Sequence, residues 1–446
     1  MSEDARPTTH HSSLITHHFL LGLRCFRCGA TYPPGPLWGG CPACAAAGKP
    51  SNLYCVYDYP AVAQALDRAE LARRPANLWR YRELLPVAAE HAVTLDEGMT
   101  PLLRAERLGR RYGLDQLYLK DESRNPTWSF KDRLAAVGAA KARELGAGVL
   151  AVASSGNAGA ATAAYAARAG LDAYLFTTEQ FPPTMRAFMQ AYGAKVFAVP
   201  TAPDRLTMVR RGVEERGWVP IQNYVMPPVG APAYMLDGAK TVGFELAEQL
   251  GWRVPDVVVA PTSNGDLPVG VWRAFLELRE LGWVDRVPRM VAAEVYGALA
   301  NALAKGLDHT ETMPSWPTVA FSAGNPVSAY QSLLMLRETG GTALGASEDE
   351  IMAAQLLLAR TEGIWAEAAS ALTLATIAKL AASGAIRRDE VVVALITSGG
   401  LKDPDATLRY VPPIPLIQPT FEDLERALSE PSAISHQPSA SSAPKS

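Results

Sequence analysis

Short apolar runs alternate with longer amphipathic or alanine-rich stretches along most of the chain, and Gly, Pro and Asn separate them. The short runs have the length of buried strands, and the stretches between them have the length of helices. Seven runs are predicted strands: Gln116–Leu119, Val149–Ala153, Ala173–Phe176, Lys195–Val199, Asp256–Ala260, Met290–Val295 and Val391–Ile396. Helices between successive strands favour crossover connections, so we expect an α/β fold with mostly parallel strands, divided between two sheets.

Composition and charge are those of an ordinary globular protein. The 446 residues are 48% hydrophobic and 20% charged, and this length predicts two or three domains. The near balance of 42 basic and 45 acidic side chains, with a net charge of -3, argues against nucleic acid or an anionic membrane as a partner. No run reaches the roughly 18 to 20 apolar residues of a membrane-spanning helix, and we expect a cytoplasmic protein.

The two ends of the chain differ from the rest. Residues 1–19 are polar and rich in histidine, and residues 429–446 are rich in Ser, Pro and Ala. Neither segment has enough apolar side chains to form a core, so we expect a disordered arm and a disordered tail without assigned chemistry.

Four of the five cysteines form two Cys-x-x-Cys pairs, Cys25/Cys28 and Cys41/Cys44. Two such turns can aim four thiolates at one point, which is typical of a closed, structural zinc site. The segment is too small to bury a core of its own, so metal binding would be coupled to its folding. A redox pair and buried free thiols are the alternatives. Cys55 falls outside the spacing and is expected to be a small buried hydrophobe.

Lys131 stands where a polar loop gives way to a helical stretch. The helix dipole disfavours a cation at that end by about 0.3 to 1 kcal/mol and so eases loss of its proton. A neutral amine is what a Schiff base requires. A solvated surface lysine paired with Asp132 is the simpler alternative, and the neighbouring motifs argue against it.

Three polar loops directly follow predicted strands, namely Ser154–Gly159, Thr262–Leu267 and Thr397–Pro404. The carboxyl ends of parallel strands are where open α/β sheets bind ligands. Backbone N–H groups at a helix start, with glycine allowing close approach, can hold an anion such as phosphate. Each loop taken singly can also be a plain turn.

Together these motifs resemble those of the threonine synthases, in the fold type II, tryptophan-synthase-β-like group of pyridoxal phosphate enzymes. The resemblance covers roughly residues 20–410 and rests on the cysteine pairs near the start and on four further segments: Glu97–Leu102, Asn125–Arg133, Ser154–Gly159 and Gly400–Pro404. It implies two α/β domains with the cofactor in the cleft between them. The expected division is a zinc-ribbon-like segment at 20–58, a large domain at 59–117 and 238–428, and a small domain at 118–237.

The resemblance also implies roles for individual residues. Lys131 would bond the aldehyde of pyridoxal 5′-phosphate and move protons, Asn157 would bond the ring 3-oxygen, and Thr397 would face the pyridine nitrogen. The cofactor phosphate would lie in the loop of Ser263, Asn264, Gly265, Asp266 and Leu267. Substrate contacts are expected from Ser154, Ser155, Arg133 and Lys240, with Arg186 as a further candidate for an anionic group; for these three cations, ordinary ion pairs are the alternative.

The implied activity is the conversion of O-phosphohomoserine and water to threonine and phosphate, with Lys131 taking the α proton. A neutral hydroxyl at Thr397 cannot keep the pyridine nitrogen protonated, so the ring would be a weaker electron sink. Elimination and replacement at the β or γ carbon suit such a site, because the lysine then manages each proton locally. The resemblance further implies a small amino-acid substrate and a homodimer.

Several positions depart from the pattern of that family. Trp128 stands where a glycine is usual, Met235 where an arginine is usual, and Ala239 where a glutamine is usual. These departures leave open a β-replacement enzyme that acts on O-phosphoserine, as cysteate synthase does, or a threonine or serine dehydratase. A non-catalytic binding protein is the alternative from another class. A nicotinamide dehydrogenase is disfavoured, since no Gly-x-Gly-x-x-Gly follows a strand with an acidic residue about 20 positions later.

Overall fold

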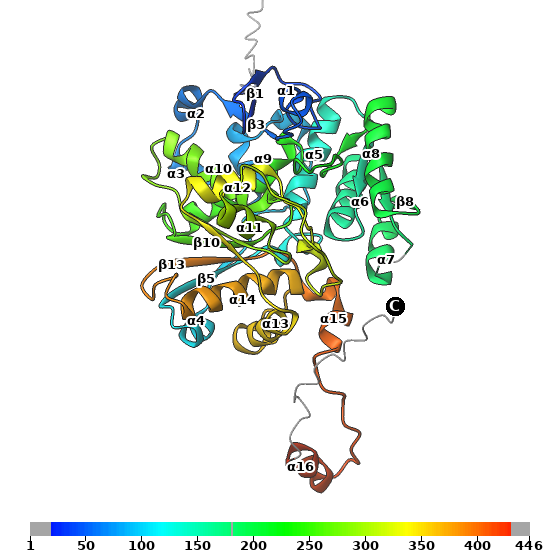
Figure 1. The fold of residues 1–446 in the computed structure, drawn as a ribbon, viewed down its shortest axis with the longest axis vertical. Coiled ribbons are helices and arrows are strands. Elements are labelled where there is room, and N and C mark those ends of the chain that lie inside the picture. Colours follow the sequence, from blue (N-terminus) through cyan, green and yellow to red (C-terminus); the bar gives the residue numbers. More distant parts are fainter. Residues whose placement is uncertain (1–18, 180–181, 430–446) are drawn as a thin grey trace, which may run out of the picture.

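A computed structural model describes residues 19–179 and 182–429, drawn as a ribbon in Figure 1. Residues 1–18 of the predicted arm and 430–446 of the predicted tail lie outside the described residues.

The largest sheet has six strands and forms the centre of the larger α/β unit. Its order is β12 (Thr342–Leu344), β11 (Arg289–Ala293), β10 (Val257–Pro261), β13 (Val391–Ile396), β5 (Gln116–Asp121) and β4 (Leu102–Arg104). The pairings from β12 through β5 are parallel, and only the edge strand β4 is antiparallel among these pairs. Both faces carry helices (Figure 1), which explains why β10 and β13 read as continuous apolar runs.

A second sheet, of four parallel strands, forms the smaller α/β unit. Its order is β8 (Lys195–Ala198), β7 (Asp172–Thr177), β6 (Val149–Ala153) and β9 (Val219–Pro220). Helices α6 (Asn157–Ala169) and α8 (Ala202–Arg216) pack against β6 and β7, and Figure 1 shows this unit at the right of the molecule.

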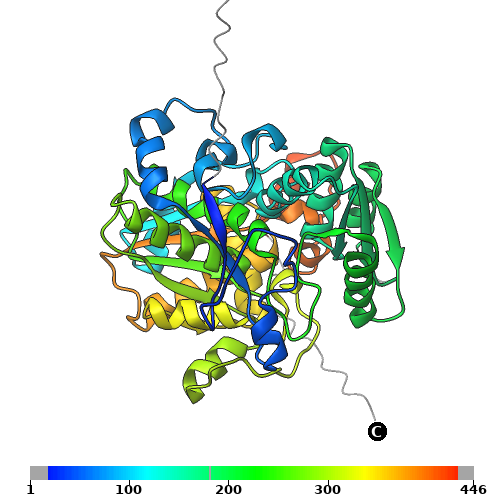
Figure 2. The ribbon, with the colours of Figure 1, turned by 90° about the horizontal axis from the view of Figure 1, so that it is seen from above.

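The cysteine-rich segment forms a third, antiparallel sheet of β2 (Thr31–Tyr32), β1 (Leu20–Cys25) and β3 (Leu53–Tyr57). It lies across the larger unit when the molecule is seen from above (Figure 2). Asn52 fixes it there by donating its amide Nδ2 to the Ala231 carbonyl at 2.7 Å. The cysteine-rich segment therefore packs directly against the rest of the protein.

Helix α9 (Ala233–Gln249) joins the two α/β units. It packs against α5 (Lys131–Glu144) on one side and α10 (Asp266–Glu280) on another, and 15 consecutive residues from Ala233 are buried. Two of its glycines make these contacts possible. A Cβ at Gly238 would lie 2.2 Å from the Arg133 carbonyl oxygen, and one at Gly243 would lie 2.5 Å from the Ala274 methyl.

The remaining helices complete the layers and are α1 (Pro42–Ala46), α2 (Tyr59–Ala65), α3 (Arg68–Leu71), α4 (Glu106–Tyr112), α7 (Pro183–Ala191), α11 (Ala298–Lys305), α12 (Tyr330–Glu338), α13 (Glu348–Glu362), α14 (Ala368–Ala382), α15 (Pro404–Leu408) and α16 (Phe421–Ser429). Five short 3₁₀ helices among the described residues are η1 (Leu78–Leu84), η2 (Ala89–His91), η3 (Glu122–Arg124), η4 (Phe321–Ala323) and η5 (Gly400–Lys402).

The predicted fold class is confirmed, and each predicted strand is present within one or two residues of its expected ends. The pattern missed the strands β2, β4, β9 and β12, because two or three residues carry too little periodicity to recognise. It also missed the longer strands β1 and β3 of the cysteine-rich segment, where no strand was predicted. The expected domain boundary at 117/118 falls inside β5, which pairs with β13 as far as Asp121. The chain therefore leaves the six-stranded sheet after Asp121 and not before it.

Candidate active site

Lys131 is the first residue of α5, as the sequence predicted, and its amine lies between the two α/β units. Nζ donates to Oε1 of Gln222 at 3.2 Å and lies 4.0 Å from Oδ2 of Asp266. Gln222 follows β9 of the smaller sheet, whereas Asp266 begins α10 of the larger unit. Burial lowers the pKa of Lys131, and the Asp266 carboxylate opposes that shift. The environment thus favours the neutral, nucleophilic amine more than water does.

The loop between β10 and α10 has the form of an anion-binding helix start. Gly265 has φ +91°, and a Cβ there would collide with Oγ of Ser332. The Ser332 hydroxyl donates to the Asn264 carbonyl at 2.8 Å, and Ser328 donates to the Ser263 carbonyl at 2.9 Å. The loop carbonyls are therefore held by hydroxyls, while the first N–H groups of α10 have no acceptor within the helix. This arrangement suits a phosphate group.

Asn157 is the first residue of α6, and both the nitrogen and the oxygen of its side-chain amide form hydrogen bonds. Its Nδ2 donates to Oε2 of Glu367 at 2.7 Å. Its Oδ1 accepts from Nζ of Lys402 at 2.8 Å and from Oγ of Ser398 at 3.2 Å. The partners come from the larger unit, so this one side chain bridges the two units.

Thr397 follows β13, at the carboxyl end of the most apolar strand. Its hydroxyl lies 2.9 Å from that of Ser370, near the start of α14. Its carbonyl accepts the backbone N–H of Phe130 at 3.1 Å, which ties this strand end to the residue before Lys131. The predicted lysine, phosphate loop, asparagine and threonine are thus linked through contacts of a few ångströms.

The two serines predicted to contact substrate have different environments. The Ser154 hydroxyl accepts the backbone N–H groups of Gly156 and Gly159, each at 3.2 Å, and so shapes its own loop. The Ser155 hydroxyl lies 2.9 Å from that of Thr177 and accepts from the guanidinium of Arg205 at 3.3 Å. Arg205 forms no ion pair with a carboxylate among the described residues.

Arg133 and Lys240 are not brought to the site, at odds with the predicted substrate contacts. Both are fully buried. Arg133 pairs with Glu122 at 2.7 Å and also with Glu245, and Lys240 pairs with Glu277 at 2.9 Å. A cation whose donors already contact buried carboxylates cannot also bind a substrate phosphate. Arg133 and Lys240 therefore form ion pairs in the core instead. Arg186 lies exposed on α7.

The departures from the family pattern fall into two kinds. Met235 and Ala239 are fully buried in α9, and Met235 packs against Gly138 of α5, so both are packing positions. Trp128 is 43% exposed, and its ring centroid lies 5.3 Å from that of Phe188. Its φ of +62° is a conformation that favours glycine, which explains why a glycine is usual there.

Three residues of the site were not predicted. Lys402 was part of a recognised motif, but nothing in the sequence placed its amine on Asn157. Glu367, the residue before α14, meets Asn157 from more than 200 positions away. The buried Nε2 of Gln222 has no hydrogen-bond partner in the part of the chain that the structure describes. An unsatisfied buried donor beside Lys131 is typical of a ligand site.

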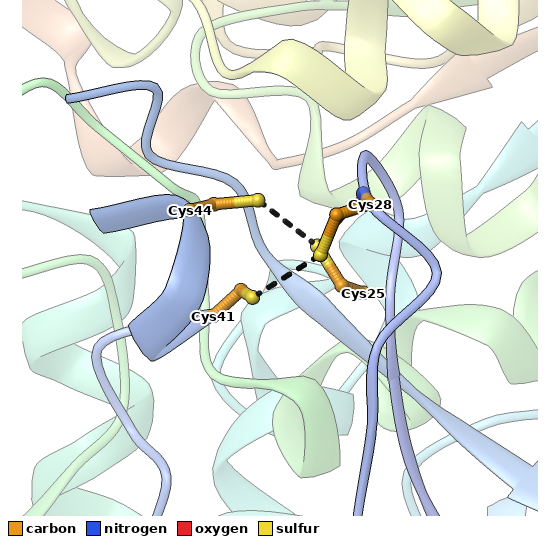
Figure 3. Close-up of side chains that lie close together, drawn as sticks. All are labelled: Cys25, Cys28, Cys41 and Cys44. Atoms are coloured by element: carbon orange, nitrogen blue, oxygen red, sulfur yellow. Dashed lines mark hydrogen bonds between the residues drawn. The ribbon is translucent and has the colours of Figure 1, made fainter. Parts of the chain in front are cut away.

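The four motif cysteines converge, as their spacing predicted (Figure 3). Their sulfur atoms all lie within 4.8 Å of one another. Sγ of Cys25 is 3.6 Å from that of Cys44, and Sγ of Cys28 is 3.7 Å from that of Cys41. Cys55 is buried outside this group, as expected.

An open groove of about 620 Å³ lies elsewhere, between Trp252, Trp283, Asp256 and Arg286. It is at the amino ends of β10 and β13, the edge opposite to that where α/β sheets bind ligands. No predicted site residue lines it. Among the described residues, no helix is long and apolar enough to cross a membrane.

Comparison with known proteins agrees with this geometry. A family model described as pyridoxal-phosphate dependent enzyme matches residues 93–398. The threonine synthase of Methanocaldococcus jannaschii is 37% identical over 415 residues, which cover 91% of this chain and 99% of that protein. The threonine synthase of Methanosarcina acetivorans is 37% identical over 394 residues, covering 86% and 93%. Maize serine racemase has a similar fold, with a TM-score of 0.61 and 21% identity over 80% of this chain and 100% of that one.

Proposed function

Because the chain belongs to the threonine synthase family of pyridoxal-phosphate dependent enzymes, we propose that it converts O-phosphohomoserine and water to threonine and phosphate. The observation that carries the proposal is the place of Lys131. Its buried amine lies 4.0 Å from Oδ2 of Asp266, the first residue of α10 in the larger unit, and is hydrogen-bonded to Gln222 of the smaller unit.

The residues present fit pyridoxal 5′-phosphate. Gly265 leaves the space that a Cβ would fill, and the start of α10 offers backbone N–H groups to a phosphate. We assign the phosphate to Ser263, Asn264, Gly265, Asp266 and Leu267, the ring 3-oxygen to Asn157 and the pyridine nitrogen to Thr397. When bound, the cofactor supplies an aldehyde that condenses with amines and a ring that accepts electrons from the substrate's α carbon.

The protein's own groups manage the protons. Lys131, with its lowered pKa, takes a proton from the substrate's α carbon and returns protons later in the reaction. Gln222 of the smaller unit and Asp266 of the larger unit hold its amine in place. The Thr397 hydroxyl, neutral and shared with Ser370, leaves the pyridine nitrogen without a carboxylate partner.

Ser155 and Arg205 are proposed to meet the anionic group of the substrate. Arg205 is a half-buried cation, and burial lowers its pKa with no carboxylate to oppose the shift. A phosphate on the substrate would provide the missing counter-charge. Ser154 contributes by holding the shape of the loop that presents Ser155.

We also propose that the four cysteines bind one structural zinc ion. A tetrahedral site with Zn–S bonds of about 2.3 Å has sulfur–sulfur edges of about 3.8 Å. The distances between the sulfur atoms of Cys25 and Cys44, 3.6 Å, and of Cys28 and Cys41, 3.7 Å, are close to that value. A homodimer and a cytoplasmic location are further proposals that rest on the resemblance and the sequence, and light scattering tests the first.

The decisive assay measures phosphate and threonine formed from O-phosphohomoserine by protein loaded with the cofactor. O-phosphoserine with a sulfur nucleophile, threonine alone and serine alone serve as the competing substrates. Release of phosphate only from O-phosphoserine would replace the proposal with a β-replacement activity, and 2-oxo acid formed from threonine or serine would indicate a dehydratase. A protein that takes up no cofactor would indicate a binding role.

A further inference from the structure

Lys402 is a second buried amine at the site, and no part of the proposed reaction uses it. It ends η5, is 3% exposed, and follows the Thr397 strand end. Nζ lies 2.8 Å from Oδ1 of Asn157 and 3.4 Å from Oγ of Ser129. Burying an ammonium is costly unless it is paired and hydrogen-bonded, so its position calls for an explanation.

The hydrogen bonds of Asn157 define which way its amide faces. Oδ1 accepts from Lys402 and Ser398, and an ammonium can only donate. One N–H of Nδ2 donates to the Glu367 carboxylate, which can only accept when it is ionised. The second N–H has no acceptor among the described contacts. A flipped amide would place a carbonyl oxygen against Glu367 and an NH₂ group against Lys402, so only one orientation is allowed.

We propose that Lys402 and Glu367 are positioning residues that act through Asn157, fixing its free N–H toward the 3-oxygen of the cofactor ring. This inference rests on the proposed function, since it needs the ring 3-oxygen to lie at Asn157. Lys402 also places a positive charge one hydrogen bond away from that oxygen. With the cofactor bound, this charge would favour the anionic form of the 3-oxygen. It would also lower the pKa of the nitrogen through which Lys131 bonds the cofactor.

The charged groups that face Lys402 support a cationic state at neutral pH. Burial lowers the pKa of Lys402 to about 8, while Asp132 of α5 and Glu367 before α14 favour the charged form. Asp132 is in turn held by the Thr127 backbone N–H at 2.7 Å. The centroid of the Phe188 ring lies 5.6 Å from Nζ of Lys402. Two carboxylates thus balance the ammonium, and one of them, Glu367, also accepts the hydrogen bond from Nδ2 of Asn157.

The test combines cofactor affinity with the spectrum of the bound cofactor. Lys402→Met removes the charge and keeps much of the volume; Lys402→Arg keeps the charge. Each cofactor-free protein is titrated with pyridoxal 5′-phosphate by visible absorbance, and the pH midpoint of the absorbance change is recorded.

We expect Lys402→Met to raise the Kd at least tenfold and to move the midpoint to higher pH. Lys402→Arg should return the midpoint most of the way to the wild-type pH. Lys379→Met, on exposed α14 surface, is the matched control and should change neither.

A double-mutant cycle decides whether Lys402 acts through Asn157. If it does, Lys402→Met in an Asn157→Ala background should add no more than about twofold to the Kd, because the amide it orients is gone. A wild-type Kd and midpoint in Lys402→Met, or full additivity in the cycle, overturns the inference. Should Lys402→Met fail to fold by circular dichroism, Ser398→Ala removes the other donor to Oδ1, and the same non-additivity is expected. Failure of wild-type protein to bind cofactor or release phosphate would instead overturn the proposed function.

Discussion

The guanidinium of Arg205 lies 3.3 Å from the hydroxyl of Ser155, at the loop between β6 and α6, and meets no carboxylate among the described residues. The half-buried cations Arg27, Arg74 and Arg289, by contrast, each form an ion pair with a carboxylate. This contrast separates a cation available to a ligand from cations that hold the core.

We expect Arg205→Met to lower kcat/KM for O-phosphohomoserine by roughly 10- to 100-fold, the size of a lost charge-assisted hydrogen bond. The loss should lie mainly in KM. The Kd for pyridoxal 5′-phosphate should stay unchanged, because Arg205 touches no residue assigned to the cofactor. Arg210→Met, an exposed position on the same helix, is the control. Equal kinetics in the two variants would exclude Arg205 from the substrate site.

Lys131→Ala should abolish covalent attachment of the cofactor. Wild-type protein incubated with pyridoxal 5′-phosphate and then borohydride should gain one reduced adduct, located by peptide mass spectrometry at Lys131. The variant should gain none and should lose turnover by several orders of magnitude, because both the bond and the proton carrier are removed. Lys195→Ala, at a solvent-exposed ion pair, should behave as wild type. An adduct at any other lysine would contradict the assignment.

Arg133→Met should destabilise the fold rather than alter substrate binding. The change leaves the carboxylates of Glu122 and Glu245 buried, although Lys120 still pairs with Glu245 at 2.6 Å. Removing one partner of a buried pair costs about 3 to 5 kcal/mol, which corresponds to a fall in Tm of roughly 3 to 5 °C for a chain of this length. The thermal melt of cofactor-free protein provides the measurement.

The control for that melt is Arg211→Met, which breaks an exposed pair with Glu215 and should shift Tm by no more than about 2 °C. A stable Arg133→Met protein with a raised KM would return Arg133 to the list of substrate contacts.

The stability of the protein should carry a pH-dependent contribution from Glu97. Burial raises the pKa of this carboxyl to about 7, although Leu95 N–H and the Tyr165 hydroxyl oppose the shift by donating to it. The folded state therefore binds the proton more tightly than the unfolded state does. The stabilising effect is present below a pH of about 4.5 and is lost as the pH rises to about 7, a change of about 3 kcal/mol.

Glu97→Gln removes that titration, so the Tm of the variant relative to wild type should be more favourable at pH 8 than at pH 5. Melts of both proteins across this range provide the test. A difference between the two that does not change with pH would show that Glu97 does not titrate there.

Zinc removal should loosen the cysteine segment and lower the stability of the whole chain. We expect one zinc ion per chain by elemental analysis, and its loss in Cys28→Ser. Because the segment is docked on the body through Asn52 and by an Arg27–Asp308 ion pair, its unfolding exposes part of α9 and should lower Tm. Cys55→Ser, outside the cluster, should retain the metal. Full metal content in Cys28→Ser would argue against a four-cysteine site.

Local pattern was enough to predict seven of the thirteen described strands, the helix start at Lys131 and the convergence of the four cysteines. Val391–Ile396 is apolar throughout because both faces of its sheet are covered, and each Cys-x-x-Cys turn carries two of the four sulfur atoms that lie within 4.8 Å of one another. The resemblance added the assignments of Asn157, Thr397 and the α10 loop on the same local grounds.

Only the tertiary structure decided which cations form ion pairs in the core and which lie at the candidate site. Arg133 and Lys402 both stand near recognised motifs, but one meets Glu122 and Glu245 in the core and the other meets Asn157. Their partners are supplied by segments up to about 245 positions away. A charge takes its role from the groups that pack around it, and that packing is a property of the assembled sheets and helices, not of any short stretch of sequence.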